Sequence, residues 1–495
     1  MIPVVDVFAG PGGLGEGFSA FTDSRGRRVF QLATSFEKEP NAHATLRLRA
    51  FRRQFHGPPP AAYGRFLRGE SSWEDLAARH PRETLVAQAE ARLVELGPGT
   101  AGEVREVVRA SLPARTDAWV LVGGPPCQAY SLAGRSRNKG NADYSAERDG
   151  RQTLYIEYLQ LLADHAPPVF VMENVKGLLS AELKSQRIFD RILADLGNPA
   201  RALMRESRHV GRRRPQYEIV ALSPKAGLHE HHASRFLVRA EEHGIPQRRH
   251  RVILIGLRRD VPAGRFSPIM PTAHETTVAT ALADLPRLRS GLSDTLDSDE
   301  AWRSRLLDFR RSDWIRAVDA PVRRVMRDVL DGLSVPRLSR GKNVHDFGDN
   351  ETLLNHTTRG HMRMDLARYL FASCFGRVRG TSPRLADFPP ELLPSHGNVN
   401  RALGHGLFSD RFRVQVDGRA STTITSHISK DGHYYIHPDP SQCRSLTVRE
   451  AARLQTFPDD YFFCGPRTAQ YQQVGNAVPP ELAKRIAGLV HQTLT

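Results

Sequence analysis

The sequence predicts an α/β protein in which a parallel sheet, covered by helices on both faces, is joined to a second, smaller and less regular domain. Two observations support this prediction. Within the first 260 residues, short apolar segments alternate with helical patterns, an order typical of parallel sheets. Beyond Arg259 the alternation fades, and residues 260–420 are rich in Arg, Pro, Ser and Asp. At roughly 100–200 residues per domain, a chain of 495 residues has room for both domains.

The first domain is expected to contain strands with helices between them. Apolar, β-branched segments that end at Gly, Pro or charged residues predict the strands, which are Ile2–Phe8, Phe30–Phe36, Ala118–Val122, Val169–Met172 and Val252–Leu257. Helical periodicity predicts helices at Tyr155–His165 and Gln186–Leu196. From about residue 41 to 116 a basic stretch and a proline break precede helical periodicity over Trp73–Leu96. We interpret residues 41–116 as a helical insertion between strands.

The remainder of the chain carries scattered signals without alternation. Helices are expected at Ser312–Leu333, His361–Phe371, Thr447–Gln455 and Pro480–Leu494. Strand and turn signals occupy Ser421–His437. This irregular pattern distinguishes the second domain from the first.

The charge of the chain favours a polyanionic partner. Lys and Arg number 70 against 54 Asp and Glu, which gives a formal net charge of +16. Such a basic protein favours nucleic acid as its partner. Arg greatly outnumbers Lys, as a GC-rich genome would also produce, so the charge alone leaves compositional drift open.

Several kinds of protein are excluded. No run approaches about 18 apolar residues, so we expect no membrane span. The N-terminus MIPVVDVFAG lacks a basic region and a cleavage site, so we expect a cytoplasmic, nucleoid-associated protein. His229–His232 has no second ligand cluster, and we expect no metal site. The cysteines stand too far apart for a disulfide scaffold, a CxxC zinc site or an iron–sulfur cluster; they are Cys127, Cys374, Cys443 and Cys464.

A glycine-rich turn, Phe8-Ala9-Gly10-Pro11-Gly12-Gly13, follows the first predicted strand. Glycines at this place let a nucleotide-like ligand approach the backbone, and the next helix points its N-terminus at that ligand. Glu37, after the second strand, is placed to accept hydrogen bonds from a ribose. The spacing differs from the GxGxxG of dinucleotide sites, so a purely structural turn stays open.

Two further segments follow predicted strands. Cys127 lies in Gly123-Gly124-Pro125-Pro126-Cys127-Gln128, a stiff and exposed loop that would suit a nucleophilic thiolate. An inert buried cysteine is the alternative. Glu173, in Glu173-Asn174-Val175, could act as a general acid or hold the edge of a base, or could only stabilise a helix N-terminus.

A basic segment, Gln247-Arg248-Arg249-His250-Arg251, directly precedes the last predicted strand. Alternate residues of an extended segment face the same way, so Arg249 and Arg251 share a face. Their guanidinium groups could bind a base oxygen, a phosphate or a carboxylate. A surface basic run is the alternative.

The order of these motifs resembles that of the DNA cytosine-5 methyltransferase family. The glycine turn, PPCQ, ENV and QxRxR are followed by RSLTVREAARLQTFP from Arg444 and by QVGNAVP from Gln473. The resemblance covers residues 4–257 and 421–490 in the family's unpermuted order, and the combination of motifs is highly specific. It implies a Rossmann-like, S-adenosylmethionine-dependent methyltransferase domain and a target-recognition domain.

The resemblance implies catalytic roles for four residues. Cys127 looks like the nucleophile that attacks C6 of a cytosine, so that C5 can take a methyl group from a sulfonium donor. Glu173 matches the residue that offsets charge at N3. Arg251 matches the residue at the base O2, and Arg249 is expected to support the loop or a phosphate.

The resemblance also implies an S-adenosyl-L-methionine site. Phe8 would lie near the adenine, the turn near the methionine part, and Glu37 at the ribose. The family's acid for the adenine amino group is blurred by the insertion, and Asp117 is the nearest candidate. The full expected set is Phe8, Ala9, Gly10, Gly12, Gly13, Leu14, Glu37, Pro125 and Asn476.

The resemblance divides the chain into a catalytic domain at residues 1–262, a target-recognition domain at 263–464 and a returning C-terminal segment at 465–495. Double-stranded DNA is the expected substrate, with the cytosine flipped out of the helix. The segment Asn355–His361 could contact phosphates or form a solvated loop. We expect a monomer, and whether a separate, unfused restriction endonuclease accompanies it stays open.

Two other functions compete with DNA methylation. The tRNA-modifying branch of the family keeps PPCQ and ENV, so an RNA cytosine-5 methyltransferase is the alternative enzyme. A DNA-binding module without catalysis is the third possibility. The third is opposed by the intact residues Cys127, Glu173, Gln247, Arg249 and Arg251. The basic charge and the long variable region favour duplex DNA over RNA.

Overall fold

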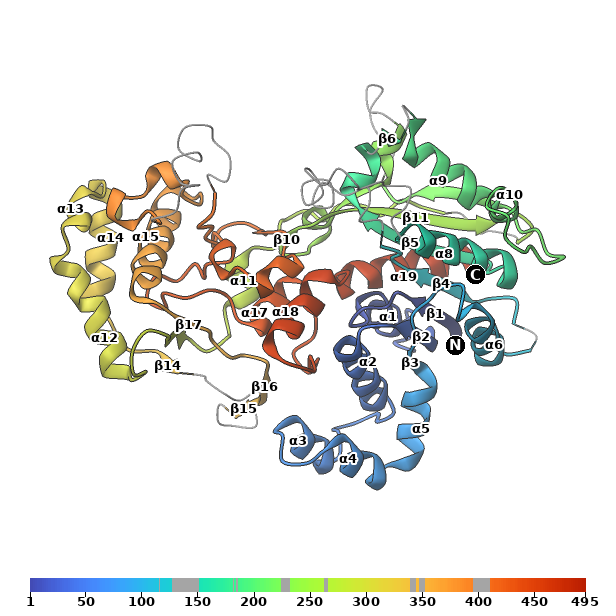
Figure 1. Cartoon of the computed structure of the whole chain (residues 1–495), viewed down its shortest axis with the longest axis horizontal. Coiled ribbons are helices and arrows are strands. Elements are labelled where there is room, and N and C mark those ends of the chain that lie inside the picture. The colour runs from blue at the N-terminus through green and yellow to red at the C-terminus, as the bar shows by residue number, and fades with distance from the viewer. Residues whose placement is uncertain are drawn as a thin grey trace.

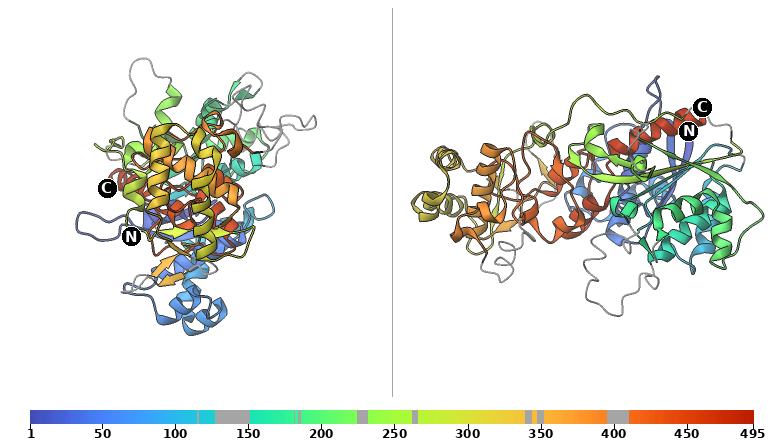
Figure 2. Two further views of the ribbon diagram at one scale, coloured as in Figure 1. Left: turned by 90° about the vertical axis from the view of Figure 1, so that its left-hand side faces the viewer. Right: turned by 90° about the horizontal axis from the view of Figure 1, so that it is seen from above.

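The computed structural model describes residues 1–114, 116–126, 151–180, 182–183, 186–223, 232–261, 266–338, 344–346, 352–394 and 410–495. The molecule is elongated, with a sheet domain at one end and a helical domain at the other (Figures 1 and 2). Short helices, among them residues 448–454 and 467–476, lie between the two domains, and the C-terminal helix at residues 480–494 packs on the sheet domain (Figure 1). None of the described helices is long and apolar enough to cross a membrane.

The sheet contains eight strands in the order β3-β2-β1-β4-β5-β11-β8, with β9 paired to β11. The strands are β1 (Ile2–Val7), β2 (Phe30–Glu37), β3 (Ala91–Leu93), β4 (Val120–Gly123), β5 (Val169–Val175), β8 (Tyr217–Ala221), β9 (Leu237–Arg239) and β11 (His250–Arg258). All five strands that the sequence predicts are present.

The expectation of a parallel sheet is confirmed for β3, β2, β1, β4 and β5, which pair in parallel. It is wrong for β11, which runs antiparallel to both β5 and β8. A parallel neighbour requires a crossover connection, usually a helix. Between β8 and β11, the described residues hold only short 3-10 turns and the short strands β9 and β10 (Gln247–Arg248), so β11 runs back along the sheet.

Alternating side chains of the strands build two apolar layers. Val5, Leu121 and Leu254 pack on the face covered by α6 (Ala101–Ser111), α8 (Arg151–His165), α9 (Ile188–Gly197) and α10 (Pro199–Arg205). Val4, Val122 and Ile253 pack on the opposite face against α1 (Gly13–Ser19) and α19 (Pro480–Leu494). The period of two in a strand places neighbouring residues on opposite faces, and the C-terminal helix thereby closes the second layer.

The region predicted as a helical insertion contains helices and also one strand of the sheet. Its helices are α2 (Pro40–Arg53), α3 (Ala61–Leu67), α4 (Trp73–Arg79), α5 (Pro81–Glu90) and α6. The expected helix over Trp73–Leu96 is wrong in part, because Pro81 starts a new helix and the segment ends in the edge strand β3. Helices α3, α4 and α5 project from the sheet domain as a lobe (Figure 1).

The second domain is built around α15 (Arg363–Arg379), most of which is buried. Around it pack α12 (Asp299–Asp308), α13 (Asp313–Ala317) and α14 (Ala320–Asp331). The expected helix Ser312–Leu333 is broken between α13 and α14, because Pro321 begins a new first turn. The two-residue strands of this domain are β12 (Leu288–Arg289), β13 (Gly291–Leu292), β14 (Arg337–Leu338) and β17 (Gly360–His361), with the short hairpin β15 (Val344–Asp346) and β16 (Thr352–Leu354).

A further apolar cluster lies between the two domains. It contains residues of α11 (Val278–Leu282), α17 (Val448–Leu454) and α18 (Arg467–Asn476). Of the strand signals over Ser421–His437, only β18 (Ser421–Thr422) forms, and it pairs with β10 (Gln247–Arg248) of the sheet domain. The chain of the second domain therefore returns directly to the arginine-rich motif.

The expectation for Asn355–His361 is wrong. Asn355, His356 and Thr358 are buried rather than solvated. The His356 ring bonds the Thr447 hydroxyl and the Pro286 carbonyl. Thr447 caps the N-terminus of α17, and Pro286 follows α11. Because its partners lie inside the molecule, the segment supports the packing and is not a phosphate-binding loop.

Candidate active site

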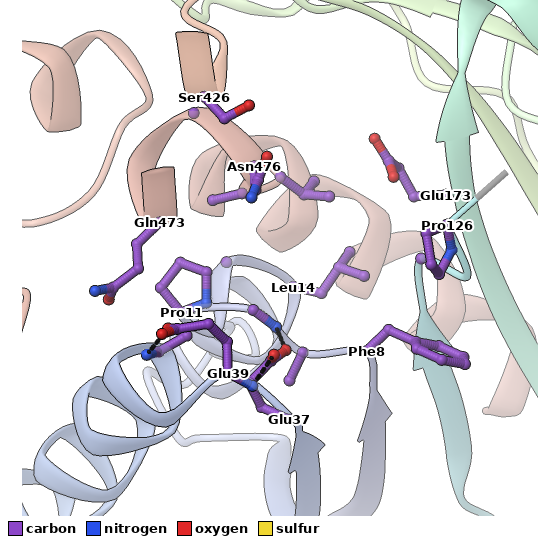
Figure 3. Close-up of a pocket in the computed structure, with 18 of the residues that line it drawn as sticks. Phe8, Pro11, Leu14, Glu37, Glu39, Pro126, Glu173, Ser426, Gln473 and Asn476 are labelled. Carbon is purple, nitrogen blue, oxygen red and sulfur yellow. Dashed lines mark hydrogen bonds between the residues drawn. The ribbon is translucent and has the colours of Figure 1, made fainter. Parts of the chain in front are cut away.

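A cavity of about 970 Å³ opens at the carboxyl ends of β1, β2, β4 and β5. This is the edge at which open α/β sheets bind ligands. Figure 3 shows Glu173 beside Pro126, Glu37 at the far end, and Phe8 and Leu14 in between. The expected residues that line the cavity are Phe8, Ala9, Gly10, Gly13, Leu14, Glu37, Pro125, Glu173, Arg249, Arg251 and Asn476. Gly12 lies in the turn beside it and is not part of the lining.

The glycine turn has a backbone that few residue types can adopt. Gly10 and Gly12 have φ values of 56° and 94°, and Phe8 has 57°, all in the left-handed region that favours glycine. A Cβ on Gly13 would lie 2.1 Å from the Val478 carbonyl oxygen. A Cβ on Gly10 would meet nothing within 4 Å. The turn is thus packed tightly on the GNAVP segment and open toward the cavity.

Glu37 ties the second strand to this turn. One carboxylate oxygen accepts the Gly10 N–H at 2.8 Å, and the other accepts those of Lys38 and Glu39 at 3.0 and 2.8 Å. Burial raises the pKa of Glu37, against these three hydrogen bonds, which lower it. Oε2, which accepts only the Gly10 N–H among the described residues, has a lone pair for a further donor, so the group can accept a ligand hydroxyl without moving.

Glu173 and Arg251 form an ion pair at the other end of the cavity. Arg251 Nε lies 2.8 Å from Glu173 Oε1, and both side chains are about 13–14% exposed. They meet because β5 and β11 are antiparallel neighbours, with Val175 opposite Arg251. Gly124 leaves room here, since a Cβ on it would lie 3.1 Å from Glu173 Oε2. The pair presents a carboxylate and a guanidinium together at this end of the cavity.

Asn174 positions the loop that carries the predicted nucleophile. Its side-chain amide donates to the Pro125 carbonyl at 3.2 Å, and Asn174 is buried. This role was not foreseen, although the ENV motif contained the residue. Cys127 itself lies outside the described residues, which stop at Pro126 and resume at residue 151.

Arg249 lines the cavity and also bonds backbone carbonyls at the end of a helix. It is 2% exposed, and its Nη1 donates to the carbonyls of Ile424 and Gly475 at 2.9 and 3.2 Å. Gln455, nearby, donates to the Val474 carbonyl at 2.8 Å. These carbonyls include the last ones of α18, which have no partner within the helix. Arg249 thereby positions Asn476, whose exposed side chain borders the cavity.

The acid expected near the adenine is not Asp117. Asp117 is exposed and precedes β4. It therefore lies at the amino end of that strand, whereas the cavity lies at the carboxyl ends. Glu95 follows β3 and lines the cavity with Val94 and Leu96. Its carboxylate pairs with Lys38 Nζ at 2.8 Å. The missed signal was β3 itself, because an acid after the third strand cannot be found until that strand is recognised.

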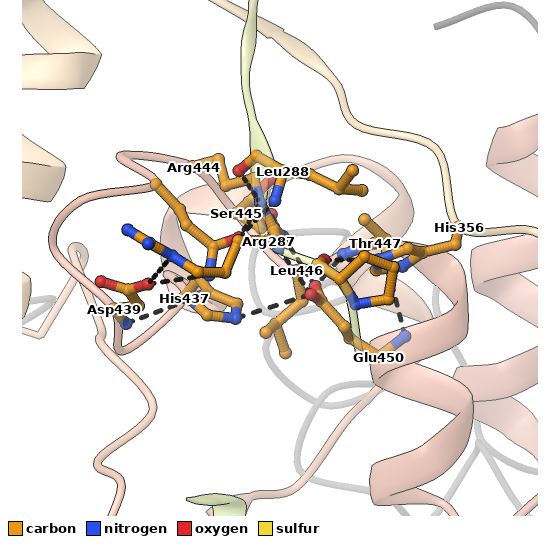
Figure 4. Close-up of polar contacts among 12 residues, drawn as sticks. Arg287, Leu288, His356, His437, Asp439, Arg444, Ser445, Leu446, Thr447 and Glu450 are labelled. Carbon is orange, nitrogen blue, oxygen red and sulfur yellow. Dashed lines mark hydrogen bonds and ion pairs between the residues drawn. The ribbon is translucent and has the colours of Figure 1, made fainter. Parts of the chain in front are cut away.

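The RSLTVREAARLQTFP segment forms a buried polar network and not a wall of the cavity (Figure 4). Arg444 donates to both Glu450 oxygens at 2.7 and 2.6 Å, and Arg444 also reaches the Leu288 carbonyl at 2.9 Å. Although burial opposes ionisation, Arg444 and His437 hold the pKa of Glu450 well below its usual range. Removal of one partner from such a pair leaves an uncompensated buried charge. The network therefore stabilises the packing of this segment against the strand that contains Leu288.

Comparison with known proteins identifies the family. The model of the C-5 cytosine-specific DNA methylase family matches residues 97–198 and 229–492. The type II methyltransferase M.Bpa9945I of Bacillus paralicheniformis is 30% identical over 514 aligned residues, which cover 99% of each chain. The DNA (cytosine-5-)-methyltransferase M.ApeKI of Aeropyrum pernix is 26% identical, with 81% of this chain and 87% of that protein covered.

A solved structure supports the fold. The crystal structure of a putative DNA modification methyltransferase encoded within an E. coli prophage superposes with a TM-score of 0.50 at 17% identity, and the match covers 100% of this chain and 99% of that one. The chain therefore belongs to the C-5 cytosine-specific DNA methylase family and is a DNA (cytosine-5)-methyltransferase.

Proposed function

We propose that this chain transfers a methyl group from S-adenosylmethionine to C5 of a cytosine within a specific sequence of double-stranded DNA. One observation carries the proposal: the Glu173–Arg251 pair and the turn held by Glu37 share a single cavity. The relative M.ApeKI is named a DNA (cytosine-5-)-methyltransferase, which favours DNA over the RNA alternative.

The cavity suits the proposed donor. Its volume of about 970 Å³ falls in the range of ligand sites. Glu37 would accept hydrogen bonds from the ribose hydroxyls, the open backbone at Gly10 would face the methionine part, and Asn476 would border the same part of the site. Glu95 would accept from the adenine amino group. When bound, the donor supplies an electrophilic methyl group on a sulfonium.

The residues of the chain would activate the cytosine. The Cys127 thiolate would form a bond to C6, which places electron density on C5. Glu173, protonated or sharing a proton with N3, would offset the negative charge there, and Arg251 would hold the O2 edge while its contact with Oε1 keeps the Glu173 side chain in place. After C5 accepts the methyl group and releases its proton, the C6–sulfur bond breaks and the thiolate returns. The base must be flipped out of the duplex to reach these groups, at a cost of a few kcal/mol.

The other cysteines are poor candidates for this nucleophile. Cys374, Cys443 and Cys464 are all buried. Burial raises the pKa of Cys374 and of Cys464 to about 12, and it also raises that of Cys443. Because the thiolate is the reactive form, these thiols are inert, and the assignment to Cys127 rests on its motif directly after Pro126.

The test is transfer of tritiated methyl groups from S-adenosylmethionine to duplex DNA and, in parallel, to tRNA. Cys127→Ser should abolish transfer to DNA and leave DNA binding intact, because an alkoxide is far harder to form than a thiolate at neutral pH. Cys464→Ser is the matched control and should keep its activity. Transfer within about tenfold of wild type by Cys127→Ser, or transfer to tRNA alone, would refute the proposal.

We also propose that the enzyme modifies one recognition sequence as the partner of a separate restriction endonuclease. The relative that covers nearly the whole chain is named a type II methyltransferase. Bisulfite sequencing of DNA from a host that expresses the protein would identify the site. Methylation scattered without a common sequence would contradict this assignment.

A further inference from the structure

Tyr461 reaches the donor turn from outside the cavity. It lies between α17 and α18, is 1% exposed, and its hydroxyl donates a hydrogen bond to the carbonyl of Pro11. A Cβ on Gly12 would lie 3.0 Å from the Tyr461 hydroxyl oxygen. Tyr461 does not line the cavity. It therefore contacts the back of the turn whose front faces the proposed donor site.

Charged side chains hold Tyr461 in this position. The Arg49 guanidinium lies 4.9 Å from the centre of the Tyr461 ring, within range of a cation–π interaction. Arg49 Nη1 also lies 2.9 Å from Asp460 Oδ2. On its other side, Arg49 makes a two-bond contact with Glu16 in α1, at 3.0 and 2.5 Å. The Glu16 carboxylate attracts the Arg49 guanidinium, and the two bonds between these planar groups also fix its orientation.

The same set of contacts reaches the turn in two ways, directly through Tyr461 and through Glu16 in α1. Glu16 stands in the helix that directly follows the turn, and Arg53 Nη1 adds a third contact to it at 3.2 Å. The Tyr461 carbonyl accepts from Arg449 Nη2 at 2.5 Å, and Arg449 Nε donates to Leu354 in the second domain at 2.8 Å. Tyr461 thus links the turn, through Pro11, to Arg449 and from there to Leu354.

We infer that Tyr461 is a positioning residue for donor binding, which acts through the Pro11 carbonyl and is oriented by Arg49 and Asp460. This inference rests on the proposed function, since the ligand of the turn is S-adenosylmethionine. It assigns a task to α2, because the helix that begins the insertion supplies Arg49. A group outside the cavity then sets the shape of the turn before any donor arrives.

The test compares two tyrosines in one cluster. Tyr461→Phe removes only the hydroxyl that holds Pro11. Tyr471→Phe is the matched control, because its buried hydroxyl also donates to a backbone carbonyl, that of Leu446 at 2.6 Å, away from the turn. Calorimetric titration with S-adenosylmethionine should show Kd raised about 5- to 20-fold for Tyr461→Phe and less than about twofold for Tyr471→Phe. At saturating donor, kcat should stay within about twofold.

Hydrogen exchange of the turn gives a readout that needs no donor. Amides of residues 9–14 should exchange faster in Tyr461→Phe and not in Tyr471→Phe. If wild type failed to bind S-adenosylmethionine, the proposed function would be wrong, while faster exchange would still support the positioning role. Equal effects of the two variants, or unchanged Kd and exchange in Tyr461→Phe, would overturn it. Should Tyr461→Phe not fold, the half-exposed Asp460→Asn should raise Kd about two- to threefold, and no change would overturn the inference.

Discussion

At the scale of single residues, the proposed donor site contains an acid that the sequence analysis did not consider. Glu95 lines the cavity, whereas Asp117 lies at the far edge of the sheet. We expect Glu95→Gln to raise the Kd for S-adenosylmethionine by about 3- to 10-fold, because a charged acceptor would become a neutral one. Asp117→Asn is the control and should leave Kd unchanged. Reversed effects in this pair of titrations would restore the first assignment.

Asp6 gives a prediction about pH. It is fully buried on β1, and burial is the main cause that raises its pKa to about 8. The unfolded chain has an aspartate pKa of about 3.9, so between pH about 4 and about 8 the folded state holds a proton that the unfolded state releases. Stability should therefore fall as the pH rises through this window, by up to about 1.4 kcal/mol per pH unit from this group.

Asp6→Asn should flatten that dependence, because the amide has no proton to lose. Urea unfolding midpoints of both proteins at pH 5, 6, 7 and 8 would measure it. Parallel pH profiles for wild type and variant would show that Asp6 is already ionised in the folded protein over this pH range, against the raised pKa.

At the scale of elements, the two arginines of the QxRxR motif should differ in what they support. Arg249→Met leaves the carbonyls of Ile424 and Gly475 without their donor and should lower the melting midpoint by about 4–10 °C. Arg251→Met, at the cavity, should change the midpoint less and reduce turnover at least about 100-fold. Calorimetry and methyl-transfer rates of both variants test this division. A stable but inactive Arg249→Met would show instead that Arg249 acts on the substrate.

The elements also show where the sequence was informative. Runs of buried Val, Ile and Leu in β1, β4 and β11, and the apolar period of α19, are local signals, and the structure agrees with them. The direction of β11 and the short edge strand β3 depend on pairing with distant residues, which no local pattern encodes. In the same way, motifs located Glu173 and Arg251, whereas Tyr461, Arg49 and Glu95 gain their places only through tertiary packing.

At the scale of the whole molecule, sequence choice is predicted to reside in the second domain. The motifs of the shared chemistry lie outside residues 260–420, and the readout of base edges must differ with each target. The contacts of residues 260–440 argue against exchanging that stretch as one block. Its segment Asn355–His361 bonds to Thr447 and Phe463, which lie beyond residue 440, and Ile424 accepts from Arg249 of the sheet domain.

A graft should therefore move residues 293–351 and 362–420 into a relative with a different target and keep the recipient's own supports. We expect this two-block chimera to methylate the sequence chosen by the present enzyme, as determined by bisulfite sequencing. A one-block graft of residues 260–440 is the comparison, and it should melt at a lower temperature because both sets of buried bonds would join mismatched partners. If the two-block chimera is active and keeps the recipient's specificity, recognition lies elsewhere, and the lobe of α3, α4 and α5 becomes the next segment to exchange.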